Sequence, residues 1–134
     1  MYVTLADMLD AFGENEVLAI SDRENSGEID TAVINEGLRR AISEAESYLS
    51  RRYSMPPAAC PAVLTAVVCD IARYRLTGGP ATETDPIRER YKLAIAWLEQ
   101  VAQGKVDLAE LEEAGQECGD VQMSSNPVVW GQIL

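Results

Sequence analysis

The fold of this chain is decided by one stretch, residues 53–76, which reads YSMPPAACPAVLTAVVCDIARYRL. Its first 17 residues carry no charged side chain, although 25% of the whole chain is charged. Three prolines interrupt the first half, and the apolar part after them is shorter than the ~20 residues that a membrane-spanning helix needs. The stretch therefore predicts a helix over residues 61–77 that is buried on nearly all sides, with other helices packed around it.

Amphipathic helices are predicted on both sides of this central helix. Apolar residues recur every three or four positions from Ile34 to Leu49 and again from Ile87 to Ala102. Two shorter apolar patterns precede them, and helices of that length are expected to dock on longer ones. We predict an all-α fold, a small bundle of four to five helices over residues 4–12, 14–20, 30–52, 61–77 and 86–103.

The ends of these helices carry recognisable signals. Thr4, and Asp85 ahead of Pro86, are residues typical of N-cap positions. Arg51 and Arg52 are expected to close the helix that precedes the central stretch, where positive charge complements the helix dipole.

The domain organisation follows from a change in amino-acid composition near the C-terminus. Residues 1–108 form the predicted helical domain, and residues 109–134 form an extended tail that is first acidic and then apolar. We expect this tail to become ordered on assembly with a partner, the alternative being that it folds back on its own domain. The tail residues assigned to the interface are Val128, Val129, Trp130, Ile133 and Leu134.

The net charge of −11 is unevenly distributed, with −6 in residues 1–52, 0 in residues 53–104 and −5 in residues 105–134. Such a surface repels DNA and anionic membranes. The simpler interpretation is that the acidity only keeps the protein soluble.

Three basic residues in the helical region are further interface candidates. Arg88 and Lys92 lie on the exposed face of the last predicted helix and can meet an acidic neighbour, although a solvated face is the ordinary alternative. Arg73 lies on the central helix, whose all-round apolarity suggests a contact with the next subunit near Ala62 and Ala66. We expect Asp70 to pair within its own helix with Arg73 or Tyr74 rather than to act as a catalytic acid.

Residues 22–30 resemble part of a calcium-binding loop. The position that normally supplies a bidentate glutamate is Val33, which weakens the pattern. The alternative is a polar loop in which Gly27 adopts positive φ and Asp30 caps the next helix. The candidate metal ligands are Asp22, Glu24, Ser26 and Asp30.

The residues that most enzymes depend on are missing or scattered. The chain has no histidine, and its three cysteines, Cys60, Cys69 and Cys118, lack metal-ligand spacing. We therefore expect no enzyme activity and no cofactor. The odd cysteine count indicates a reducing compartment, and the N-terminus lacks the pattern of a signal peptide.

An ordered set of short motifs resembles one family, the Mu-like bacteriophage and prophage proteins of a domain of unknown function thought to act at the head–tail junction. The resemblance covers about residues 1–108. Its loop at residues 22–30 departs at Glu24 and Ser26 from the family's more Asp-rich form. The motifs are MYVTLADM at residues 1–8, SDR at 21–23, ID at 29–30, YLSRRY at 48–53, CDIARYRL at 69–76, RY at 90–91, AWL at 96–98 and GKV at 104–106.

This resemblance implies a structural virion protein, a head–tail connector or adaptor subunit located in the neck and assembled in the cytoplasm of the bacterial host. Such subunits form a homo-oligomeric ring, usually a dodecamer, between the portal protein and a tail-side connector or stopper protein. DNA passes through the ring without sequence-specific binding, and no membrane is involved. The alternative is a free cytosolic acidic interaction module that is directed at a host protein or mimics DNA.

Overall fold

The computed structural model describes residues 1–77 and 84–111, and these residues form an all-α bundle. The predicted fold class is confirmed, and the predicted helix bounds agree with the observed ones to within a few residues. The helices are α1 (Leu5–Phe12), α2 (Glu14–Ser21), α3 (Thr31–Leu49), α4 (Ala62–Leu76) and α5 (Asp85–Ala102).

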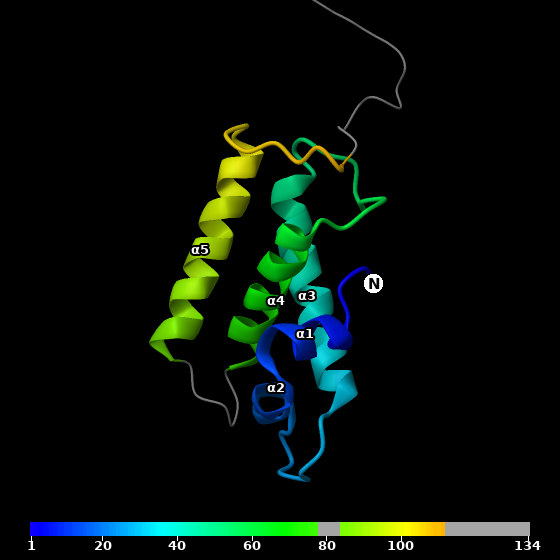
Figure 1. Cartoon of the computed structure of the whole chain (residues 1–134), viewed down its shortest axis with the longest axis vertical. Helices are drawn as coiled ribbons and strands as arrows, with labels where there is room; N and C mark the ends of the chain where they lie inside the picture. The colour runs from blue at the N-terminus through cyan, green and yellow to red at the C-terminus, as the bar shows by residue number, and fades with distance from the viewer. Residues whose placement is uncertain (78–83, 112–134) are drawn as a thin grey trace, which may run out of the picture.

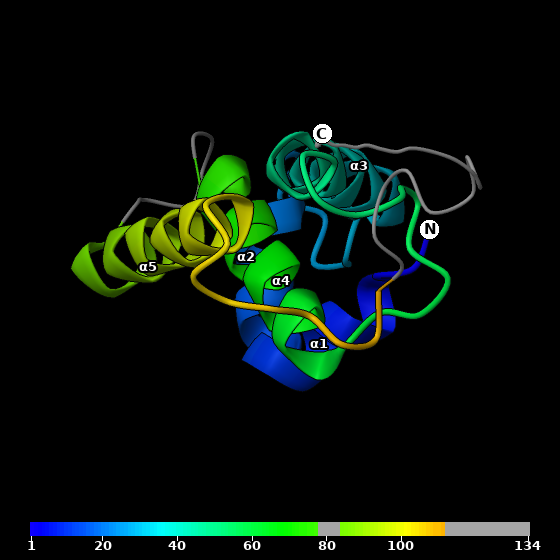
Figure 2. The ribbon, with the colours of Figure 1, turned by 90° about the horizontal axis from the view of Figure 1, so that it is seen from above.

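Helix α4 lies at the centre of the bundle (Figures 1 and 2). It packs against α3 on one side and α5 on another, while the short helices α1 and α2 cover a third side near its C-terminal end. The segment after α5 crosses one end of the bundle, over the end of α3 and the start of α4 (Figure 1). The stretch that decides the fold is therefore its central element.

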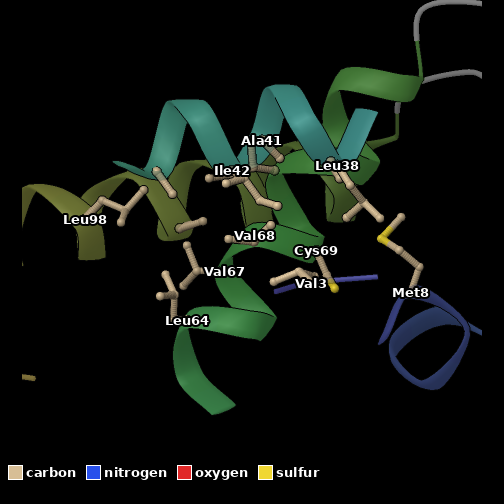
Figure 3. Close-up of a cluster of buried hydrophobic side chains, with 14 of the residues drawn as sticks. Val3, Met8, Leu38, Ala41, Ile42, Leu64, Val67, Val68, Cys69 and Leu98 are labelled. Atoms are coloured by element: carbon tan, nitrogen blue, oxygen red, sulfur yellow. The ribbon is translucent and has the colours of Figure 1, made fainter. Parts of the chain in front are cut away.

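The core is built from small and branched apolar side chains contributed by every helix. Figure 3 shows Leu38 of α3, Val68 of α4 and Leu98 of α5 in one cluster, and all three are fully buried. Val3 and Met8 close the cluster from the N-terminal side. The same core continues to Leu108 and Leu111, so the packed region extends three residues past residue 108.

One glycine sets the distance between α3 and α4. A Cβ atom placed on Gly37 would lie 2.8 Å from Cγ of Leu76, well inside van der Waals contact. The absence of a side chain at this position lets the last turn of α4 rest directly on α3. Gly37 thus has a packing role that offsets the cost of a glycine inside a helix.

Two helix ends differ from the sequence prediction. Helix α3 ends at Leu49. The carbonyl of Leu49 accepts the backbone N–H groups of both Arg52 and Tyr53, at 3.0 and 2.9 Å, and these bonds turn the chain away from the helix axis. Helix α5 begins at Asp85 rather than after it. The carbonyl of Thr84 accepts the first helical bond, so Thr84 occupies the N-cap position.

Arg52 therefore lies beyond α3 and does not close it. Its guanidinium donates to the backbone carbonyls of Val101 and Val106, both at 2.9 Å, and forms an ion pair with Asp107 at 2.7 Å. The first of these carbonyls belongs to the last turn of α5, where it also accepts the backbone N–H of Gly104 at 3.1 Å. Arg52 thus adds a charged hydrogen-bond donor at the C-terminal end of α5, a helix distant from it in sequence.

Candidate interaction surfaces

Arg73, predicted to be an interface residue, is buried inside the subunit. Only 8% of it is exposed, and its guanidinium forms an ion pair with Glu16 of α2 at 2.9 Å. The same group lies over the ring of Phe12, 4.2 Å from the ring centre. Arg73 therefore joins α4 to α1 and α2, and the surface it offers to another molecule is small.

Asp70 pairs with a different helix from the one predicted. Its carboxylate lies 3.4 Å from the guanidinium of Arg90 on α5, while Arg73 turns away toward Glu16. Burial raises the pKa of Asp70 above its ordinary value, although the charge of Arg90 and, more weakly, that of Arg73 act in the opposite direction. Spacing along one helix pointed to Arg73, but the packing of α5 supplied a nearer cation.

The substitution Asp70→Asn is expected to change how stability depends on pH. Because the folded state raises the pKa of Asp70, the stability that this carboxyl contributes is present below its unfolded pKa, near 3.8, and is lost as pH rises through the folded pKa. Between about pH 3 and pH 7, wild type should therefore lose stability relative to the variant.

Urea unfolding of both proteins at several pH values measures this difference. A relative gain for wild type with rising pH would contradict the expectation, because it would mean that Arg90 outweighs burial. The exposed residue Asp85→Asn is the matched control, and its difference from wild type should not follow the same course.

A second cluster, around Arg75, joins the three long helices. Its guanidinium donates to both carboxylate oxygens of Glu44 on α3, at 3.0 Å, and to the hydroxyl of Tyr91 on α5, also at 3.0 Å. The rings of Tyr74 and Tyr91 stack with their centres 4.1 Å apart. We did not predict this cluster from the sequence. The visible signal was that two of the helices each carry a tyrosine next to an arginine, at residues 74–75 and 90–91.

A shallow depression of about 370 Å³ lies between α3 and the end of α4. Arg23, Arg40 and Arg75 stand around it, but each is engaged within the subunit. Arg23 donates to the carbonyl of Leu76 at 3.1 Å, and Arg40 pairs with a glutamate of its own helix at 2.8 Å. The arginines therefore serve the packing of the bundle.

The loop considered as a calcium site uses its carboxylates in other ways. Asp22 accepts the backbone N–H groups of Ser26 and Gly27, at 2.8 and 2.7 Å, and these bonds lower its pKa. Gly27 has φ of +85°, and Asp30 caps α3 by accepting from two backbone N–H groups, as the alternative interpretation predicted. Within residues 1–77 and 84–111, no three histidine, cysteine or acidic side chains converge to hold a metal ion.

The remaining predicted interface residues fall into two groups. Lys92 is exposed on α5, and Arg88 is half-buried and paired with Asp85 at 2.7 Å. The tail residues Val128, Val129, Trp130, Ile133 and Leu134 lie outside the described part of the chain.

The buried cysteine of α4 is a packing residue. Burial raises the pKa of Cys69 to about 12, so this thiol stays protonated and packs as a small apolar group. None of the helices in the described residues is both long and apolar enough to cross a membrane.

Together these observations define a class: a small acidic helical bundle whose polar clusters join its own helices. The sequence matches the family model described as Bacteriophage Mu, Gp36 over residues 2–125. The chain therefore belongs to this family, and it is a protein of Mu-like phage or prophage type. This confirms the resemblance drawn from its motifs.

Two relatives illustrate the family. The chain is 37% identical over 106 residues to the Mu-like prophage FluMu protein gp36 of Haemophilus influenzae, covering 78% of this chain and 74% of that protein. It is 32% identical over 109 residues to gene product J of Escherichia phage Mu, covering 79% of this chain and 76% of that protein.

Proposed function

We propose that this protein is a head–tail connector subunit of a Mu-like phage, with no catalytic activity. Copies of the chain form a ring in the neck of the virion, between the portal protein and a tail-side stopper protein. DNA passes through the centre of the ring without being bound at particular sequences. The family membership supports a phage protein, and the distribution of charge supports the connector role.

The charge of the bundle is separated between its two parts, and this observation carries the proposal. Residues 1–30, which include α1 and α2, contain eight acidic residues and one arginine. Residues 31–77 and 84–111 contain nine acidic and ten basic residues. A strongly acidic end repels the DNA phosphates in a channel, whereas a nearly neutral body packs against identical copies without strong self-repulsion.

The proposal is tested on purified particles of the phage that encodes this chain. Quantitative mass spectrometry should find the chain in tailed virions at a copy number similar to that of the portal protein. Cryo-electron microscopy of the neck should show the helical bundle repeated around the axis. A chain that is absent from virions but abundant in infected cells would instead identify a free interaction module directed at the host.

Deletion of residues 120–134 tests whether the tail takes part in assembly. All core residues of the described bundle precede this segment, so the shortened chain is expected to fold. Infection with the deletion should yield separate heads and tails. If the deletion phage still forms infectious particles at the wild-type yield, the tail has no part in joining.

A further inference from the structure

The outer side of α4 and α5 carries a group of exposed apolar side chains, which we call the α4–α5 strip: Val63, Ala66, Leu93, Ala96 and Trp97. Val63 is 43% exposed and Leu93 is 68% exposed. Ala66 and Ala96 are also exposed, and Trp97 is half-buried. Single exposed apolar residues are ordinary, but a contiguous group of them marks a binding surface.

The ion pair between Asp70 and Arg90 shows that the two helices contribute to the same side. Val63 and Ala66 lie seven and four residues before Asp70, and so on its face of α4. By the same spacing, Leu93 and Trp97 lie three and seven residues after Arg90, on its face of α5.

The same ion pair also shows which residues of α4 lie opposite which residues of α5 along the helix axes. Helices α4 and α5 run antiparallel and side by side (Figures 1 and 2). Because each residue rises about 1.5 Å, Trp97 lies about level with Val63, and Leu93 about level with Ala66. The apolar residues therefore form one continuous surface across two helices.

The surroundings of the strip decide what kind of partner fits. None of its five members is charged, and Asp70 and Arg90, which lie on the same side, are paired with each other, while the exposed Glu89 and Lys92 lie at its edge on α5. The stretch before it, residues 53–62, is also free of charge. A surface of this kind favours an apolar, uncharged segment over an acidic or basic one.

We infer that the strip binds the last eight residues, 127–134, of a second copy of this chain. That segment reads PVVWGQIL, which has no charged side chain and is rich in branched and aromatic residues. Residues 112–126 connect it to Leu111 and can span about 50 Å when extended, enough to reach a neighbouring subunit. This inference rests on the proposed ring, in which every copy offers both a tail and a strip.

A photo-crosslinking experiment on the full-length chain tests the inference. Leu93 is replaced by the photoreactive residue p-benzoylphenylalanine, and ¹⁴N- and ¹⁵N-labelled chains are mixed before assembly and irradiation. Mass spectrometry should find crosslinks to residues 127–134, with the probe and the tail on differently labelled chains. The same probe in place of Arg39, which is exposed on α3, should give none of them.

Two variants add an independent measurement. Leu93→Glu places a charge in the strip, and Trp130→Ala removes the largest side chain of the segment. With the probe at Val63, each variant should reduce the yield of the tail crosslink at least about tenfold, as expected for loss of a central contact. Circular dichroism should show that both remain folded, because Leu93 is exposed and the core of the described residues is complete by Leu111.

Three results would overturn the inference: crosslinks within one chain, crosslinks to other residues or to the portal protein, or an unchanged yield in both variants. These results are separate from the test of the connector role. If virions contain the chain at the portal copy number while crosslinks map elsewhere, the ring stands and the tail position is wrong. If virions lack the chain, the ring itself is wrong.

Discussion

The substitution Leu98→Ala is expected to lower the free energy of unfolding by about 2–5 kcal/mol. Leu98 is fully buried on α5 and belongs to the core shown in Figure 3. Removing its branched end loses apolar burial and leaves a cavity between α5 and the other helices, which cannot close completely around it. Urea unfolding followed by circular dichroism measures the change.

The same helix provides the matched control, Leu93→Ala. This substitution removes the same atoms with the same change in helix propensity, but Leu93 is 68% exposed. Its effect on the unfolding free energy of the isolated subunit should stay within about 0.5 kcal/mol. Equal costs at the two positions would mean that α5 is rotated relative to the orientation described above.

Much of the fold could be predicted because the signals are local. The apolar spacing from Ile34 to Leu49 depends only on the period of a helix, and the uncharged run of residues 53–69 is visible directly in the sequence. The cap at Asp30, given as the alternative to a calcium ligand, was also predictable, because a cap contacts N–H groups only two or three residues away.

The partners of the charged residues could not be predicted, because they depend on how helices pack. Asp70 has Arg73 one turn away on its own helix, yet it meets Arg90, while Arg73 meets Glu16. These pairings follow from how α2 and α5 are rotated about their own axes and shifted along the axis of α4. A sequence pattern predicts which face of each helix is apolar, but not how far one helix is shifted along the other when those faces pack.

The burial of α4 shows the same limit. The lack of charge in its first half predicted a helix covered on nearly all sides, and α3, α5 and the pair α1–α2 do cover three of them. The N-terminal half nevertheless leaves Val63 and Ala66 exposed. Within residues 1–77 and 84–111, three neighbouring groups of helices are too few to enclose it, so its apolarity exceeds what the described bundle covers.

The substitution Arg52→Met is expected to lower the free energy of unfolding by about 2–3 kcal/mol. Methionine keeps much of the apolar stem but cannot donate to the carbonyls of Val101 and Val106, which would lose a charged partner. The ion pair with Asp107 would also be lost, although that carboxylate is largely exposed and regains water.

Hydrogen exchange distinguishes this effect from a general loss of stability. The segment after α5 is attached to the bundle by Arg52 and by the bond from the N–H of Leu108 to the hydroxyl of Tyr53, at 2.8 Å. In the Arg52→Met variant, residues 103–111 should exchange earlier than the central helix α4. Arg51→Met, at the exposed neighbouring position, should leave both unchanged. Equal effects of the two substitutions would show that the guanidinium of Arg52 does not hold the end of α5.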